Sequence, residues 1–317
     1  MATHHVKAIR RGLATALLLL VVGWAQAAER LKPFHLASTH GGDLNQVATE
    51  VKQKLTDNGF TIVGSYVPYT QASFPDGQVV SAQVIGVTSP ALLKAAAQTP
   101  FGGYAAVQRV AVTEVKREGA TQIQVSYTDP TYMANAYRLK GDLADVTAAL
   151  EKALGSQQTF GSDKGLSAER LRKYHYKFMM PYFTDADLLA TYASHQQAVS
   201  AVHSGLAAHR GGTGEVYQVD IPGTQSTLFG VALSGPSGND CSGDAHIMSR
   251  IDFGPVKSTG HLPYGVLVVD NKVYALAAKF RIAINFPDLS MMGANSFLSI
   301  MCAPGSIKKA LKAAAGG

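Results

Sequence analysis

The sequence predicts an α+β protein of two similar sheet-plus-helix domains, which arose by internal duplication and are joined by a helical connector. Two observations predict it. First, Ala134-Asn135-Ala136-Tyr137 recurs as Ala294-Asn295-Ser296-Phe297. Second, each copy follows alternating apolar residues and an Asp/Pro corner, and alternation with a period of two is typical of a half-buried strand. These strands and corners are Ile123, Val125 and Tyr127 with Asp129-Pro130, and Phe280, Ile282 and Ile284 with Pro287-Asp288.

The first domain is expected at residues 28–160. Asp43 can cap a helix, because apolar residues from Leu44 to Leu55 recur at helical spacing. Residues 60–67 and 78–87 are expected to form strands. The remaining expected elements are a short helix after Ser89-Pro90, a hairpin that turns near Gly119 and a helix that opens at Asp142.

Residues 161–212 are interpreted as the helical connector. Thr184 and Asp187 resemble the start of a capping box, and an apolar stripe follows from Leu188 to Leu206. The second, diverged domain is then expected at residues 213–317.

Within the second domain, Val266 and Val268 before Asp270-Asn271 predict a hairpin. Arg281 follows in the last predicted strand, on the face opposite its apolar residues. That face is expected to point to solvent, or into a cleft where the guanidinium can hold a carboxylate in a bidentate pair.

Residues 1–27 are typical of a cleaved secretory signal peptide. Lys7, Arg10 and Arg11 give a positive start, an apolar run follows at 13–22, and an Ala-x-Ala pattern places the cut after Ala27. The run is shorter than the roughly 20 residues of a spanning helix, so no membrane span is expected after cleavage. We therefore expect a periplasmic protein.

Charge argues against a nucleic-acid partner. The net charge is +6, but the leader holds three of the 28 basic residues, which leaves 25 against 22 acidic residues, or +3. No run of five or more basic residues occurs, and basic patches of that kind are typical of nucleic-acid binding. The expected partners are a small ligand, another envelope protein or a second copy in a homodimer.

Cys241 and Cys302 are the only cysteines. In an oxidising compartment an even pair predicts a structural disulfide. Two separate buried thiols and a redox or metal-binding pair are the alternatives, although no C-x-x-C spacing supports redox work.

Methionine and histidine suggest copper handling as an alternative function, because soft sulfur and imidazole ligands suit copper. That hypothesis requires at least three such atoms within about 5 Å of one another. Core packing explains the same methionines, and we expect no metal site. The residues concerned are His175 with Met179-Met180, His246 with Met248, and the pairs Met291-Met292 and Met301-Cys302.

No motif nominates a catalytic residue or a cofactor. There is no G-x-S-x-G elbow, and Gly102-Gly103 and Gly211-Gly212 lack the Lys and Ser/Thr of a phosphate-binding loop. An enzyme with an unrecognised site between the domains stays open as an alternative.

The densest aromatic stretch, residues 173–183, lies between the proposed domains, where ligand clefts often form. It can line a pocket or a partner contact, or it can be the hydrophobic seam that joins the domains. The candidate surface consists of Tyr174, His175, Tyr176, Phe178, Tyr182 and Phe183, with Arg281.

The stretch from Asn58-Gly59-Phe60 through residues 78–87 to Tyr127-Thr128-Asp129-Pro130 resembles the bacterial domain of unknown function 302 family. The resemblance covers residues 40–155 and implies a small α+β domain, of a type sometimes exported and sometimes duplicated. His261-Leu262-Pro263-Tyr264 and residues 281–292 look like a diverged second copy. The family has no accepted reaction, so the resemblance implies nothing about catalysis. The sequence thus predicts an exported binding or accessory protein of unknown ligand.

Overall fold

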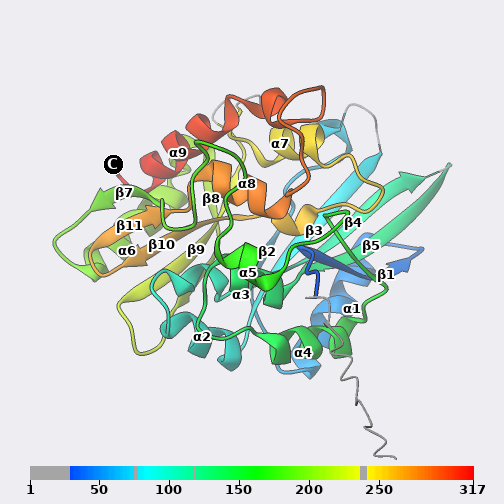
Figure 1. Cartoon of the computed structure of the whole chain (residues 1–317), viewed down its shortest axis with the longest axis horizontal. Helices are drawn as coiled ribbons and strands as arrows, with labels where there is room; N and C mark the ends of the chain where they lie inside the picture. Colours follow the sequence, from blue (N-terminus) through cyan, green and yellow to red (C-terminus); the bar gives the residue numbers. More distant parts are fainter. Residues whose placement is uncertain (1–28, 75–77, 118, 236–240) are drawn as a thin grey trace, which may run out of the picture.

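The computed structural model describes residues 29–74, 78–117, 119–235 and 241–317. The predicted leader lies outside these residues. The described chain is a mixed α and β structure with two separate antiparallel sheets (Figure 1). None of its helices within the described ranges combines the length and apolar character needed to cross a bilayer.

The first sheet has six strands in the order β2-β3-β4-β5-β1-β6. Its central strands β4 and β5 form the hairpin predicted around Gly119, and their inner residues are almost fully buried. The strands are β1 (Phe34–His40), β2 (Thr61–Tyr66), β3 (Val79–Thr88), β4 (Gln108–Arg117), β5 (Ala120–Thr128) and β6 (Gln158–Phe160).

The second sheet has five strands in the order β7-β11-β10-β9-β8. If each sheet's strands are numbered from the first along the chain, both sheets show the order second, third, fourth, fifth, first; β6 is an addition to the first sheet. The strands are β7 (Asp187–Thr191), β8 (Thr213–Asp220), β9 (Ser226–Leu233), β10 (Tyr264–Val269) and β11 (Lys272–Ala275).

Local capping explains where several helices begin. Asp43, Ser89 and Asp129 each accept a hydrogen bond from a backbone N–H three residues later, as the sequence predicts. The helices are α1 (Leu44–Asp57), α2 (Pro90–Ala97), α3 (Pro130–Ala136), α4 (Ala144–Leu154), α5 (Ala168–Arg172), α6 (His195–Ala207), α7 (Asp244–Ile251), α8 (Ala278–Asn285) and α9 (Ala303–Ala314). Short 3-10 turns are η1 (Gln71–Ser73), η2 (Gly102–Ala105), η3 (Arg210–Gly212), η4 (Thr259–His261) and η5 (Phe297–Ile300).

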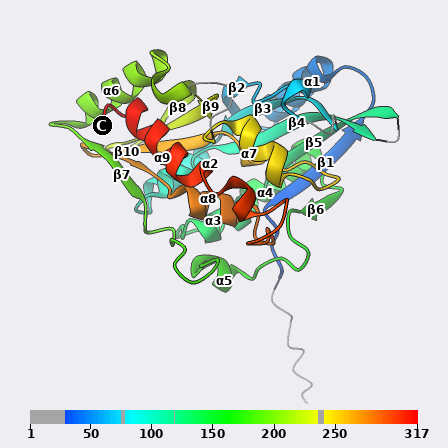
Figure 2. The same ribbon diagram turned by 90° about the horizontal axis from the view of Figure 1, so that it is seen from above.

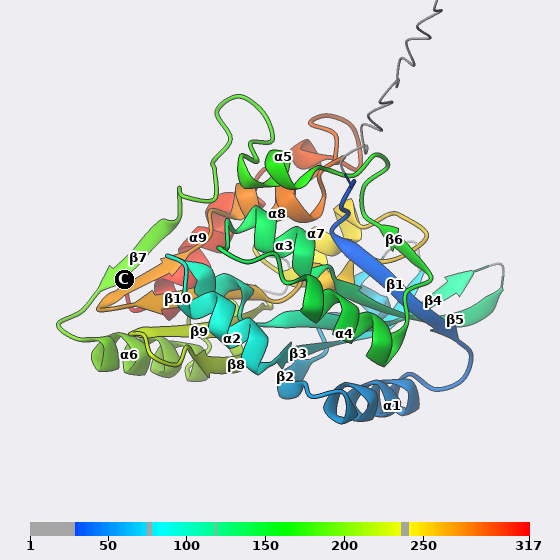
Figure 3. The same ribbon diagram turned by 60° about the horizontal axis from the view of Figure 1, so that its bottom comes forward.

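We call the part of the chain that forms the first sheet, β1 to β6, the first half, and the part that forms the second sheet, β7 to β11, with the helices that follow, the second half. Helices α1 and α6 occupy equivalent places in these two halves. Each connects the first strand of its half to the second and packs on its own sheet, and Figure 3 shows both along the same side of the molecule. Leu44, Val47, Val51 and Leu55 of α1 are buried, as their spacing predicts. Full burial of such a side chain stabilises a fold by about 1.5–3 kcal/mol, so this face holds α1 in place.

Each half also covers the sheet of the other half. The α2–η2 connection between β3 and β4 reaches β9 and β10, where Gly103 lies against Leu267. In the same way, the connection between β9 and β10 covers the first sheet, because its η4 turn packs on β3, β4 and β5. Thr113 of β4 donates a hydrogen bond to Thr259 of η4 at 2.9 Å. The two halves therefore share one core.

Residues 252–263, which we name the strap, carry most of the polar contacts of this exchange. The Gln124 side chain donates to the Pro255 carbonyl at 2.8 Å and accepts from the Lys257 N–H at 2.9 Å. At η4 the hydroxyls of Tyr69 and Thr259 lie 2.7 Å apart. Buried polar groups need such partners, so these bonds fix the path of the strap across the first sheet.

Edge strands β2 and β8 lie side by side where the two halves meet (Figure 2). Gly64 of β2 faces the backbone of Val216, and a Cβ atom at Gly64 would collide with the Val216 carbonyl. The ring of Tyr217 fills the space beside Gly86 and Gly230, and a Cβ atom at either glycine would collide with this ring. Glycine at these positions permits the close approach of the two sheets.

Two predicted elements are wrong. Residues 187–191, predicted as part of a helical connector, form strand β7, and the helix begins only at His195 after its cap Ser194. Phe280, Ile282 and Ile284 belong to helix α8 instead of a strand. Short apolar stretches fit either period, and here pairing with β11 and packing against α9 decide the outcome.

The repeated tetrapeptides do not occupy equivalent places. Helix α3 directly follows the fifth strand of the first half and is capped by Tyr137, whereas α8 directly follows the fifth strand of the second half and is capped by Phe286. The second tetrapeptide, residues 294–297, comes later and enters η5. The shared strand order is therefore independent of the motif that predicted the duplication.

The contact between β2 and β8 predicts the effect of Gly64→Ala. Overpacking of this kind costs about 1–3 kcal/mol, so we expect the free energy of unfolding to fall by that amount. Gly141→Ala is the matched control, because nothing lies within 4 Å of a Cβ there. Urea unfolding measures both, and equal stabilities of the two variants would contradict the close approach.

Candidate functional site

A small cavity lies at the junction of the two halves. Its volume is about 20 Å³, which is room for about one water-sized particle. Strands, turns and helices of both halves contribute to its wall, so it exists only where the halves meet. The lining residues are Tyr104, Arg109, Tyr137, Tyr217, Leu228, Pro263, Tyr264, Gly265, Leu276 and Arg281.

Arg109 enters the cavity from the first residues of β4. Its side chain is buried, and its Nε donates to the carbonyl of Gly260 in the strap at 3.0 Å. One further donor, Nη1, reaches the carbonyl of Val107 at the long distance of 3.5 Å. The third nitrogen, Nη2, is buried and meets no hydrogen-bond partner at normal geometry within the described chain, although the Tyr137 side chain lies close enough to the guanidinium to favour its charged form.

Arg281 enters from α8 on the other side. Its Nη1 donates to Nδ1 of His261 at 3.1 Å, and its Nη2 donates to the carbonyls of His261 and, at 3.2 Å, Pro263. Burial, reinforced by the charges of both arginines, holds the pKa of His261 well below its usual range. The imidazole is therefore neutral and accepts at Nδ1, which leaves its Nε2 proton to face the Tyr264 hydroxyl at 3.3 Å.

The positive charge of this cavity has no direct counter-ion. Among the ion pairs of the described residues, none includes Arg109 or Arg281. Burial, together with the charge of Arg281, lowers the pKa of Arg109 to about 10, so its guanidinium stays charged at neutral pH. Burying an unpaired ion costs several kcal/mol, and two like charges add repulsion.

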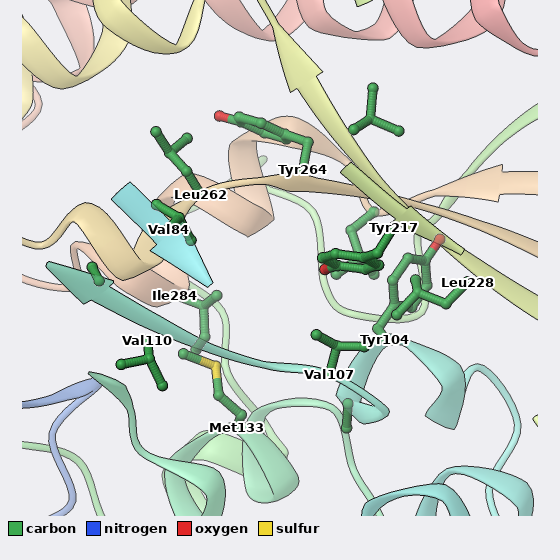
Figure 4. Packing of buried hydrophobic residues seen from close by; sticks show 14 of the residues in the cluster. Val84, Tyr104, Val107, Val110, Met133, Tyr217, Leu228, Leu262, Tyr264 and Ile284 are labelled. Carbon is green, nitrogen blue, oxygen red and sulfur yellow. The ribbon is translucent and has the colours of Figure 1, made fainter. Parts of the chain in front are cut away.

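Four tyrosines complete the wall. Tyr104 of η2 lies beside Tyr217 and Leu228 of the second half, with Tyr264 across from them (Figure 4). The Tyr104 hydroxyl is buried and has no hydrogen-bond partner among the described residues. Burial raises the pKa of Tyr104, Tyr217 and Tyr264, so these phenols remain protonated donors at neutral pH.

The arrangement is suited to hold an anion. Two arginines and four tyrosines line one small space, and no carboxylate lines it. Two residues of its wall, Arg109 and Tyr104, both from the first half, carry buried donors without a hydrogen-bond partner among the described residues, Nη2 and Oη. A negatively charged ligand would satisfy such donors with charge-assisted hydrogen bonds.

Arg281 was predicted on the solvent-facing or cleft-facing side of a strand, but it lies in helix α8. It is only 4 % exposed and lies in a helix, so the expectation of a solvent-facing guanidinium is wrong. The alternative that it faces a cleft agrees with its place in the cavity wall.

The aromatic stretch divides between seam and surface. Tyr174 and Phe183 are buried, where Tyr174 donates to the Ala283 carbonyl at 2.9 Å and Phe183 stacks on Tyr137. His175 stacks on the half-exposed Tyr182. Phe178 is 89 % exposed.

Part of this stretch lines an open surface groove of about 1000 Å³. Tyr174, His175 and Tyr176 form one wall, and residues 287–291 form another. Tyr176 donates to the Leu289 carbonyl and packs on Phe297, which fixes the two walls together. Arg281 is not among the lining residues, so the predicted surface separates into two sites.

Cys241 and Cys302 form the predicted disulfide, with their Cα atoms 5.8 Å apart. His246 of α7 lies beside them, and its ring nitrogen and the two sulfur atoms are all within 4.8 Å of one another. Other members of the methionine and histidine set are dispersed: Met248 is buried in the core, whereas Met179, Met292 and Met301 are exposed.

A polar chain that the sequence did not suggest links Ser156, His35 and Asp129. His35 Nδ1 lies 2.8 Å from the Ser156 hydroxyl, and its Nε2 lies 3.1 Å from an Asp129 carboxylate oxygen. Asp129 also caps α3, and the imidazole is buried against Tyr127. None of these side chains lines the cavity or the groove. Their hydrogen bonds instead connect β1, the start of α3 and the residues that follow α4.

The sequence analysis missed Arg109, Tyr104, Tyr137, Tyr217 and Tyr264. One signal was present: Gln108 and Arg109 open a strand that continues with buried apolar residues. A charged residue beside a buried strand needs a partner or a function. The tyrosines carry no such signal, because tyrosine is common in ordinary cores.

Residues 34–156 match the family model described as "Domain of unknown function DUF302". The DUF302 domain found there confirms the resemblance and extends it by six residues at its N-terminal side and by one at its C-terminal side. It covers the first sheet through β5 and ends before the strap begins. No curated protein and no solved structure matches the chain.

Asp252 anchors the far end of the strap that supplies the Gly260, His261 and Pro263 carbonyls. Its carboxylate accepts from the Ser258 N–H at 2.9 and 3.0 Å, and burial raises its pKa from 3.8 to about 6. Between these values the folded protein holds a proton that the unfolded chain releases. The Asp252 contribution to stability is therefore greatest below pH 4 and is lost as the pH rises through 6.

We expect Asp252→Asn to remove this pH dependence. The difference between the two pKa values corresponds to about 3 kcal/mol, so wild type should lose up to that amount relative to the variant between pH 4 and pH 7. Urea unfolding of both proteins at each pH measures the difference, and other titrating groups cancel. Parallel stability profiles would show that Asp252 does not hold the proton.

Proposed function

We propose that the protein is exported and serves in the cell envelope as a binding protein for a small anion held between its two halves. One observation carries the proposal: buried Arg109 and Arg281 face a shared cavity whose wall contains no carboxylate. The unused donors on Arg109 and Tyr104 support it.

The cavity limits the size of the ligand. Room for about one water-sized particle suits a monatomic anion such as chloride and is too little for a sugar or a nucleotide. An anion there would offset the burial cost of two guanidinium groups and fill the hydrogen-bonding capacity of the wall.

The titration behaviour of the wall favours binding over acid–base chemistry. The shifted pKa values of Arg109, Tyr104 and Tyr264 all lie far from neutral pH. A general acid or base works best with a pKa near the operating pH. These groups instead present a fixed positive charge and fixed O–H donors.

We further propose that the two halves descend from one duplicated domain. The identical order of five strands supports this, as does the equivalent position of the two connections that cover the opposite sheets. The site then belongs to neither copy alone. Arg109 comes from the first half and Arg281 from the second, so duplication followed by divergence would create an asymmetric site.

We expect bromide or chloride to stabilise the wild-type protein in a saturable way. Ligand at 100 times its Kd adds about 2.7 kcal/mol to the free energy of unfolding. Thermal unfolding in increasing sodium bromide, with ionic strength held constant by sodium gluconate, measures this. Bromide crystals should show one anomalous peak within hydrogen-bonding distance of both guanidinium groups.

Arg109→Gln and Arg281→Gln should abolish the saturable stabilisation. Arg117→Gln is the matched control, since Arg117 lies on the same strand as Arg109 at its exposed end. Bromide effects that are linear and equal in all four proteins, together with an empty cavity in bromide crystals, would refute the anion site.

Export is tested separately by the mass of the protein purified from a cell envelope. We expect the intact mass to correspond to a chain that begins at Ala28, because the Ala-x-Ala pattern places the cut after Ala27. Lys7→Glu with Arg10→Glu and Arg11→Glu should retain the uncleaved chain in the cytoplasm. An uncleaved chain in the wild-type envelope fraction would contradict the proposal.

A further inference from the structure

The disulfide and its neighbouring histidine form a compact group of potential metal ligands. Sγ of Cys241, Sγ of Cys302 and a ring nitrogen of His246 all lie within 4.8 Å of one another. The three residues come from separate places, a loop, the start of α9 and the first turns of α7, which the fold holds together. This group is distinct from the cavity, since it shares no residue with the cavity wall.

We propose that reduction of the Cys241–Cys302 disulfide opens a binding site for one d10 cation, Zn²⁺ or Cu⁺, with the two thiolates and His246 as ligands. Thiolate and imidazole are the donors that such cations prefer. In the disulfide the sulfur atoms are bonded to each other and offer no thiolate. Binding is therefore gated by the redox state of the pair.

The gating step is an ordinary thiol–disulfide exchange with a protein or small-molecule dithiol. A thiolate of the dithiol attacks one sulfur, the S–S bond breaks, and the other cysteine leaves as a thiolate. The second thiol of the reductant then displaces the first cysteine. The dithiol becomes a disulfide, and the protein gains two electrons and two protons. The thiol protons are released when the cation binds.

The surroundings of Cys302 suit this step. Cys302 is exposed, so a dithiol can reach its sulfur. It also occupies the position directly before α9, a helix of 12 residues, where its side chain makes no capping hydrogen bond. The backbone dipoles at a helix N-terminus favour negative charge, and a thiolate there is stabilised both as a leaving group and as a ligand.

His246 supplies the third ligand without depending on the disulfide for its position. It lies in α7, whose Ile247, Met248 and Ile251 are buried in the core. The strap that follows α7 is fixed on the first sheet by Gln124. We therefore expect α7 to keep its place when the disulfide is reduced.

Native mass spectrometry of the full chain with Zn²⁺ alone as the probe tests the proposal. The oxidised protein should bind no zinc. The protein reduced anaerobically with a phosphine should bind one zinc, and its mass should rise by that of one zinc ion less two protons, because both thiols deprotonate on binding. His246→Ala should weaken zinc binding at least tenfold while its disulfide still forms. His203→Ala, at an exposed histidine on α6, is the matched control and should bind like wild type.

Co²⁺ in place of Zn²⁺ gives a second readout, because thiolate ligation produces charge-transfer absorption that imidazole or carboxylate ligation lacks. We expect this absorption in reduced wild type, its weakening in Cys241→Ser and in Cys302→Ser, which each keep one thiolate, and its loss when both cysteines are replaced by serine. Equal zinc binding by oxidised and reduced protein would overturn the proposal. So would no binding on reduction, unchanged affinity in His246→Ala, or loss of the native circular dichroism when the disulfide is reduced.

Discussion

The fold depends on a mutual arrangement in which each half covers the sheet of the other. Neither sheet is covered by the helices of its own half alone. The η2 turn of the first half packs on the second sheet, and the η4 turn of the strap, from the second half, packs on the first sheet. The contacts at Gly103 and Thr259 are therefore part of one core. This arrangement also brings Arg109 and Arg281 into one cavity. The proposed anion site is a direct consequence of how the sheets are covered.

Close approach and charge burial act against each other at this junction. Glycine at positions 64, 86 and 230 lets the backbones and the Tyr217 ring approach without collision. The same closeness removes water from two guanidinium groups. Backbone carbonyls from the strap compensate part of that cost, and the neutral His261 accepts one further bond. The remaining unused donors mark the place where a ligand contributes most.

Sequence patterns predicted the elements whose signals are local. Asp43, Ser89 and Asp129 cap the helices they were expected to cap, and both hairpins turn where expected. The patterns failed where packing decides between two periods, as in β7 and α8. Arg281 was placed on the wrong element for that reason. The wall of the cavity was not predictable, because Tyr104 and Tyr264 are 160 residues apart and only the exchange of connections brings them together.

Because both halves belong to one chain, their association does not depend on the protein concentration. Two separate copies that covered each other's sheets would have to meet by diffusion, and their association would weaken with dilution. Joined through the segment between β6 and β7, each half meets the other at a high effective concentration that does not depend on how much protein is present. The interface can therefore hold buried charge and an internal cavity without the association free energy that a dissociable dimer would need at low abundance.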